Sequence, residues 1–377
     1  MEKYQKVIHG RDSLNNLPGM MEKLGISRPL IVGMEPLTGM LLKKNPSLLQ
    51  FPVFSEFHPN PDLKDTEAGA DLFTREGCDG LISVGGGSSI DTAKAIKARM
   101  NAAGEDDICS NRYDFQASCP HIAIPGTAGT GSEATQFAVV YRDEKKYSLN
   151  HPELRPDGVV LDASLLDSLP LYHKKSCALD ALSQGIESYW SRGASDDSRV
   201  HAYLAIIGVL DNLKAYLSGD LKAAEEMLDA SFQSGKAIQI TKTTAAHAMS
   251  YMLTKKMGIA HGHACMMTLP YLWDIMLDRE EMKETMRDLS EKMRLGDPRM
   301  GSRLLRGIMY ELEMKIPPVP GEEELDLLTD SVNTERLSNH PVKLTRGEIR
   351  EVYRKAMTPP CDNEKEACAD IWRYYGR

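Results

Sequence analysis

The first half of the chain repeats one unit, a short apolar run rich in β-branched residues that ends in a Gly, Ser or Asp turn. The unit occurs at residues 29–33 (PLIVG), 80–89 (GLISVGGGSS), 121–132 (HIAIPGTAGTGS) and 158–164 (GVVLDAS). An amphipathic segment with helical spacing, residues 65–77, lies between the first two runs. Strand, turn and helix in repetition predict a parallel sheet covered by helices.

From about Ser176 the pattern changes to helix-forming residues alone. Segments rich in Ala, Leu, Met, Glu and Lys, with no strand-like run between them, span 176–192, 197–218, 222–257, 263–295, 300–314 and 345–357. The prolines of residues 315–321 (KIPPVPG) forbid a continuous helix and predict a rigid connector. We therefore expect an α/β domain at 1–175 followed by an all-helical domain at 176–377.

Composition narrows the class of protein. The 377 residues include 45 Lys and Arg against 54 Asp and Glu, a net charge of −9, which disfavours a nucleic-acid partner. No apolar run reaches the roughly 18 residues that span a bilayer, and the N-terminus lacks the apolar region of a secretory signal. Seven cysteines without a CxxC pair indicate reduced thiols. These features predict a soluble cytoplasmic protein, with an enzyme the favoured class and no membrane partner.

Two glycine-rich turns indicate a phosphate-binding edge. Residues 85–89 (GGGSS) end one expected strand, and residues 125–132 (PGTAGTGS), which include Thr127 and Thr130, end the next. Glycine lets the backbone approach a phosphate closely, and a following helix offers free N–H donors. The spacing is not GxGxxG, and tight turns need glycine in any case. Two such turns at strand ends nevertheless favour a bound dinucleotide over a purely structural role.

Residues able to bind a metal gather in two helical segments: Asp180, Gln184, His247, Tyr251, His261 and His263. Asp180 and Gln184 are four residues apart, so they share one helical face. One carboxylate and two imidazoles, from Asp180, His247 and His261, suit a divalent cation, and Gln184 offers an amide oxygen as a fourth donor. The alternative is a set of hydrogen-bonded core histidines and a solvated carboxylate.

Four motifs resemble the iron-containing, group III alcohol dehydrogenases, in that family's order and over nearly the whole chain. They are GGGSSIDTAKA (85–95), PGTAGTGSE (125–133), DALSQGIESYWS (180–191), and HAMSY (247–251) with HG fourteen residues after its histidine. Within the family, residues 58–97, 179–191 and 241–264 are similar to the phosphonoacetaldehyde reductase subgroup in particular.

The resemblance implies a Rossmann-like N-terminal domain, a helical C-terminal domain and an active site in the cleft between them. Asp180, His247 and His261 match metal-ligand positions, whereas Gln184 stands where most members have a third histidine. The implied metal is Fe²⁺, with Zn²⁺ as the alternative. Tyr251 stands where many members have a histidine near the nicotinamide. Positions expected to contact the NAD(P)H cofactor are Gly86, Gly87, Ser88, Thr127, Thr130 and Lys146.

Two departures from the family pattern change the expectations. A carboxamide at Gln184 is a harder and weaker donor than imidazole, so we expect the metal to be retained but held less tightly. Many NAD-preferring members carry an Asp soon after the first strand, and here Met34 occupies that position with Glu35 beside it. The choice between NADH and NADPH therefore stays open.

The implied reaction is reduction of phosphonoacetaldehyde to 2-hydroxyethylphosphonate, with a metal polarising the carbonyl oxygen. His263 or Tyr251 is the candidate for relaying the proton to the alkoxide. Cations for a phosphonate are available near the motifs, with Lys242 the preferred candidate: Lys242, Lys255, Lys256, Arg155 and Arg192. Three alternatives remain: a dehydrogenase for small neutral aldehydes or diols, a lyase resembling dehydroquinate synthase, and a non-catalytic metal- or nucleotide-binding protein. A homodimer is expected.

Overall fold

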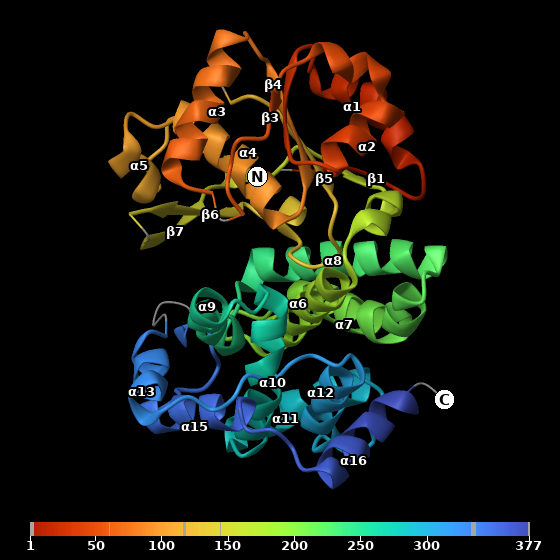
Figure 1. Ribbon diagram of the computed structural model, residues 1–377, viewed down its shortest axis with the longest axis vertical. Helices are drawn as coiled ribbons and strands as arrows, with labels where there is room; N and C mark the ends of the chain where they lie inside the picture. Colours follow the sequence, from red (N-terminus) through yellow and green to blue (C-terminus); the bar gives the residue numbers. More distant parts are fainter. Residues whose placement is uncertain (1–3, 60, 116–117, 144, 333–336, 376–377) are drawn as a thin grey trace.

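The computed structural model describes residues 4–59, 61–115, 118–143, 145–332 and 337–375. A parallel sheet with helices on both faces forms one half of the molecule, and helices alone form the other half (Figure 1). The six strands of the sheet are β1 (Lys6–His9), β2 (Pro29–Gly33), β3 (Val53–Phe54), β4 (Gly80–Gly85), β5 (His121–Pro125) and β8 (Gly158–Leu161). Every pairing in this sheet is parallel. The expected α/β architecture with an all-helical second part is confirmed.

The strand order is β1-β8-β5-β4-β2-β3, and the four strands expected from the sequence are the four central ones. Central parallel strands are covered on both faces and are therefore continuously apolar, which makes them visible in a sequence. β2, β4, β5 and β8 are buried at every position, whereas β1 is only half-buried and β3 has two residues. The two edge strands escaped prediction for this reason.

Helices cover both faces of the sheet. They are α1 (Leu17–Leu24), α2 (Leu37–Lys44), α3 (Leu63–Arg75), α4 (Gly87–Met100) and the short α5 (Glu105–Cys109). Ile31 of β2 packs in one core with α1 and α2, while its neighbours Leu30 and Val32 pack in another with α3 and α4. An antiparallel hairpin, β6 (Phe137–Arg142) and β7 (Lys145–Asn150), lies beside α4 and was not expected from the sequence.

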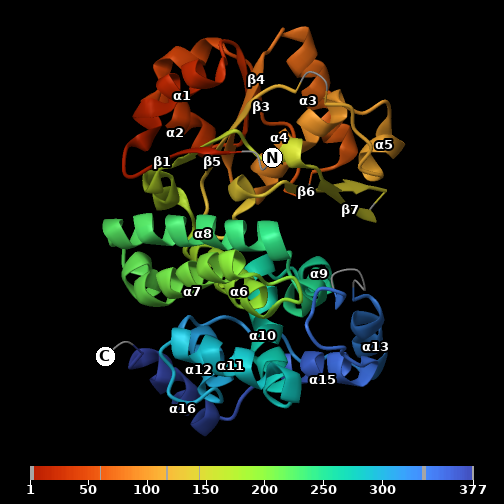
Figure 2. The ribbon, with the colours of Figure 1, turned by 180° about the vertical axis from the view of Figure 1, so that it is seen from behind.

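The helical half begins at residue 171. Its described helices are α6 (Leu171–Trp190), α7 (Asp196–Leu217), α8 (Leu221–Thr241), α9 (Ala245–Met257), α10 (His261–Leu277), α11 (Lys283–Lys292), α12 (Met300–Glu311), α13 (Glu322–Asp330), α15 (Arg346–Ala356) and α16 (Asp362–Arg373). Both ribbon views place α8 between the sheet and the other helices (Figure 2). One hydrophobic core joins these helices to Val159 and Leu161 of β8. The division into domains at residue 175 stays a prediction.

Several expected helix boundaries were wrong. Residues 222–257 form two helices instead of one, because the chain reverses at Lys242, whose backbone φ is 59°. Residues 263–295 are divided between α10 and α11, and α10 begins two residues earlier, at His261. Helices α13 and α16 were missed, whereas residues 315–321 contain no helix or strand, as expected. The break at Lys242 contains neither Gly nor Pro, the strongest local signals for the end of a helix, so it was not predicted.

Candidate active site

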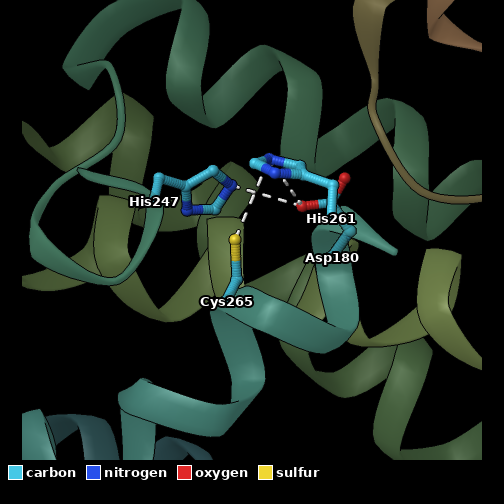
Figure 3. A group of neighbouring side chains, drawn as sticks. All are labelled: Asp180, His247, His261 and Cys265. Atoms are coloured by element: carbon cyan, nitrogen blue, oxygen red, sulfur yellow. Dashed lines mark hydrogen bonds and ion pairs between the residues drawn. The ribbon is translucent and has the colours of Figure 1, made fainter. Parts of the chain in front are cut away.

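Four side chains from three helices point toward a common centre in the helical half (Figure 3). Asp180 lies on α6, His247 in the first turn of α9, and His261 and Cys265 in the first two turns of α10. Their ligand atoms all lie within 4.8 Å of one another. Asp180 Oδ1 is 3.2 Å from His247 Nε2 and 3.9 Å from His261 Nε2, and Cys265 Sγ is 3.8 Å from His261 Nε2. The three ligands expected from the sequence are thus close together, and Cys265 joins them.

Burial and hydrogen bonding show that this group fits a divalent cation. Asp180 Oδ1 and His247 Nε2 are buried and face each other at 3.2 Å, and among the described residues neither atom makes a well-aligned hydrogen bond. Leaving a buried polar atom unpaired costs about 1–3 kcal/mol, which a bound cation would offset. The Nδ1 atoms are held by other partners, His247 by Glu187 and His261 by the Ser250 hydroxyl, so both Nε2 atoms face the centre. His261 is 43% exposed, which leaves one side of the group open to solvent.

Glu187 is a second carboxylate that the sequence analysis missed. It follows Asp180 by two helical turns on α6 and is completely buried. It accepts hydrogen bonds from the Thr244 hydroxyl at 2.6 Å and the Ala246 N–H at 2.7 Å, and it pairs with His247 Nδ1. Burial alone would raise the pKa of Glu187, but the facing His247 and these hydrogen bonds hold it below 4.5. Glu187 therefore orients His247 as an ionised acceptor. The seven-residue spacing from Asp180 was the available signal.

The imidazoles and the thiol shift one another's protonation. Burial would raise the pKa of Cys265, but the charges of His247 and His261 and their hydrogen bonds lower it to about 7. Burial would lower the pKa of His247, but Cys265, Glu187 and Asp180 raise it well above 6.5. The pocket thus favours an anionic sulfur facing cationic groups. The four-residue spacing of Cys265 from His261 was a signal that the sequence analysis did not use.

The close approach of α10 to α6 depends on Gly262. A Cβ atom at this position would lie 2.1 Å from the Ser176 carbonyl oxygen and 2.6 Å from the Asp180 Cβ. The Ser176 hydroxyl accepts a hydrogen bond at 3.1 Å from the His263 N–H at the start of α10. The absent side chain lets His261 and Asp180 share one centre.

Gln184 uses its amide for other contacts. Its Oε1 accepts a hydrogen bond from the Ser234 hydroxyl of α8 at 2.8 Å, and its Nε2 donates to the Thr130 carbonyl at 3.2 Å. These bonds connect α6 both to α8 and to the second glycine turn. A role for Gln184 as metal ligand stays a prediction.

The two glycine turns lie against each other at the carboxyl ends of β4 and β5, which are neighbours in the sheet. Gly85 has a φ of 147°, a conformation that glycine tolerates, and α4 begins two residues later. A Cβ on Gly87 would lie 3.1 Å from the Thr130 side chain, and one on Gly86 would lie 3.2 Å from Thr127. The N-terminus of α4 therefore opens between the turns, a geometry that suits a pyrophosphate.

The predicted catalytic and substrate residues lie in different places. Tyr251, one turn after His247 on α9, stacks under the Lys146 ammonium of β7 at 5.4 Å, so two predicted residues from opposite halves meet. His263 is buried, and its Nδ1 contacts the Tyr172 hydroxyl at 3.1 Å. Burial lowers the pKa of His263 to about 4, so it is neutral near pH 7. Lys242 is exposed on the turn between α8 and α9.

The sheet with its paired glycine turns and the carboxylate–imidazole group in the helical half form the arrangement expected of a metal-dependent dehydrogenase. Residues 5–163 match the family model "Iron-containing alcohol dehydrogenase", and residues 175–357 match "Fe-containing alcohol dehydrogenase family, C-terminal". The chain belongs to the iron-containing alcohol dehydrogenase family and is an oxidoreductase. This family uses NAD(P) and a divalent metal. In the part of the chain that the structure describes, no helix is both long and apolar enough to cross a bilayer.

Individual relatives act on different alcohols and aldehydes. Long-chain-alcohol dehydrogenase 1 of Geobacillus thermodenitrificans is 30% identical and covers 81% of both chains. Phosphonoacetaldehyde reductase of Streptomyces viridochromogenes is 34% identical over 51% of both chains. The solved structure of sulfoacetaldehyde reductase from Bifidobacterium kashiwanohense, in complex with NAD⁺, superposes with a TM-score of 0.86 at 26% identity, covering 94% of this chain and 98% of that chain.

Proposed function

We propose that this protein reduces phosphonoacetaldehyde to 2-hydroxyethylphosphonate with a nicotinamide cofactor. The observation that carries the reductase assignment is the convergence of Asp180, His247 and His261. Helix α9, which carries His247, also carries Tyr251, and the Tyr251 ring contacts Lys146 of the sheet half. The phosphonate substrate is supported by the similarity to phosphonoacetaldehyde reductase. Sulfoacetaldehyde, the substrate in the name of the structural relative, also carries a tetrahedral oxyanion on a two-carbon aldehyde.

The chain's own residues supply the cofactor site. The first N–H groups of α4 have no acceptor within the helix, and with Gly86, Gly87 and Ser88 they hold the pyrophosphate. At the end of β2, Met34 packs on the sheet core, while Glu35 is exposed with its carboxylate beside Gly39. An exposed carboxylate near the ribose repels a 2′-phosphate, which favours NADH over NADPH.

The substrate aldehyde sits at the open side of the metal group, next to His261. A divalent cation held by Asp180, His247 and His261 would supply Lewis-acid stabilisation of the carbonyl oxygen. Helices α9 and α10 both begin at this group, at Ala245 and His261, so their positive dipole ends also favour negative charge there. The protein thus concentrates positive potential where hydride addition creates an alkoxide.

A proton must also reach the alkoxide. Tyr251 is the candidate on the cofactor side, since its ring lies beside Lys146. A route through His263 would use Tyr172, because His263 and His261 are two residues apart on α10 and face different directions. Tyr251→Phe therefore lowers kcat more than His263→Asn if Tyr251 delivers the proton.

The reaction is tested by following oxidation of NADH and of NADPH by metal-loaded protein with phosphonoacetaldehyde, sulfoacetaldehyde and acetaldehyde in parallel. We expect the highest kcat/KM with phosphonoacetaldehyde and NADH. Preference for acetaldehyde or a diol would replace the proposed substrate with a neutral one. Cofactor binding without turnover of any aldehyde would refute the reductase assignment.

Lys242 is the proposed partner of the phosphonate. Losing a charge-assisted contact costs about 1.5–3 kcal/mol, so Lys242→Met should raise KM for phosphonoacetaldehyde by about 10- to 100-fold. KM for acetaldehyde should not change, and Lys256→Met, which removes an exposed lysine at the other end of α9, is the matched control. An unchanged KM for phosphonoacetaldehyde in Lys242→Met would refute this assignment.

A further inference from the structure

We infer that Cys265 is a ligand of the metal in this protein, so that the site is formed by Asp180, His247, His261 and a thiolate. The inference rests on the proposed metal-dependent function and specifies the metal's coordination. The family resemblance leads one to expect a third imidazole from α6, where this chain has Gln184. The fourth donor instead comes from α10.

The position of Cys265 fits a ligand. It lies four residues after His261 on α10, so the two side chains share one face of the helix. Cys265 is completely buried, and its Sγ is one of the four ligand atoms that lie within 4.8 Å of one another. In Figure 3 the sulfur points into the space between the two imidazoles and the carboxylate.

The distances between neighbouring ligand atoms are close to those of a tetrahedral metal site. Zinc bonds of about 2.1 Å to nitrogen and oxygen and about 2.3 Å to sulfur place tetrahedral ligand atoms about 3.4–3.6 Å apart. The separations here are 3.2 Å for His247–Asp180, 3.9 Å for His261–Asp180 and 3.8 Å for Cys265–His261. These three separations differ from the tetrahedral values by a few tenths of an ångström, and the remaining ligand atoms lie within 4.8 Å of one another.

Gln184 is held away from this role by its hydrogen bonds. Its carbonyl oxygen accepts from Ser234 and its amide nitrogen donates to the Thr130 carbonyl. Coordination by Gln184 would require giving up or sharing the Ser234 bond, whereas the Cys265 thiol contacts only the two histidines among the described residues.

The two donor sets differ in softness. Thiolate is a soft ligand that zinc prefers, while carboxamide oxygen suits harder cations. With Cys265 as ligand, the site has one sulfur, two nitrogens and one oxygen, and the exposed side at His261 leaves room for the substrate as a fifth ligand. Substrate access is therefore compatible with four protein ligands.

Cobalt(II) substitution tests the inference, because a cobalt–thiolate bond gives a near-ultraviolet charge-transfer band that nitrogen and oxygen ligands do not give. We expect this band in the wild-type protein and in Gln184→Ala, and its loss in Cys265→Ser. Cys368→Ser, at a buried cysteine of α16, is the matched control and should keep the band. Zinc affinity in Cys265→Ser should fall by at least the roughly 10- to 100-fold typical of losing a ligand's supporting partner.

The outcomes separate this inference from the proposed function. Cobalt that binds with visible bands but without the charge-transfer band, or with a band that survives Cys265→Ser, would overturn the thiolate ligand and leave the metal site intact. Failure of the wild-type protein to bind cobalt, zinc or ferrous iron would overturn the metal-dependent function itself. X-ray absorption of the zinc-loaded wild type tests the same point without a variant, since one sulfur at about 2.3 Å is expected.

Discussion

Glu187→Gln tests whether the buried second carboxylate holds His247 in its metal-binding orientation. The substitution keeps the size of the side chain but replaces one acceptor oxygen with an NH₂ group. One oxygen of Glu187 accepts from Thr244 and Ala246, and the other faces His247 Nδ1. A glutamine that keeps the first pair of bonds must turn its NH₂ toward the Nδ1–H that a metal-bound His247 carries.

The hydrogen bond between Glu187 and His247 that the substitution removes determines the expected loss of zinc affinity. A hydrogen bond to a charged group contributes about 1.5–3 kcal/mol, equivalent to a loss of about 10- to 100-fold in zinc affinity. Mutation of such outer-shell partners reduces metal affinity by about the same factor in other proteins. Glu187→Ala would instead leave three buried donors unpaired, a cost comparable to the whole stability of a domain, so it is less informative.

Zinc affinity is measured by chelator competition, and the melting temperature of the metal-free protein reports the fold. Glu133→Gln is the matched control, because Glu133 is also buried but is not among the four metal-facing groups, and burial raises its pKa to about 7. Unchanged zinc affinity in Glu187→Gln would show that this carboxylate does not position His247.

Three further predictions concern helix packing, the cofactor and acid stability. Gly262→Ala should lower the melting temperature and weaken zinc binding, since its Cβ would lie 2.1 Å from the Ser176 oxygen; unchanged values would contradict the packing argument. Gly87→Val should weaken NADH binding, followed by fluorescence, while zinc affinity stays constant; equal weakening of both would contradict separate sites. His340 is buried against Trp190, and burial lowers its pKa to about 4. Because the unfolded state binds a proton on this side chain more tightly, the free energy of unfolding decreases as pH falls from about 6.5 to about 4. His340→Phe should flatten that loss by up to about 3 kcal/mol in denaturant titrations, and an unchanged pH dependence would refute it.

The repeated apolar runs in the sequence predicted the strands that are buried on both faces of the sheet. The central strands, such as β4 and β5, are buried at every position and end in glycine turns, so the strands themselves were predictable, while their order in the sheet was not predicted. The edge strands β1 and β3 and the β6–β7 hairpin are only partly covered, and their mixed composition hid them.

The position at which one helix ends and the next begins was harder to predict from the sequence. The segment around Lys242 reads as continuous helix because it contains neither Gly nor Pro, yet the chain turns there at a φ of 59°. That turn allows α9 to begin at Ala245 and brings His247 to Glu187. In the turned conformation the Thr244 hydroxyl donates to the buried Glu187 carboxylate at 2.6 Å, an interaction between distant segments of the chain.

The sequence alone was enough to predict Asp180, His247 and His261 as metal ligands, because their residue types and motif order are local properties, and the assignment stays a prediction. The tertiary structure decided which atoms join them: it brought the Cys265 sulfur into the group and directed the Gln184 amide to Ser234 and Thr130. Spacing along one helix restricts a side chain to a face, but the neighbours on that face come from other helices. Their arrangement follows from packing α6, α9 and α10 at the distance that Gly262 permits.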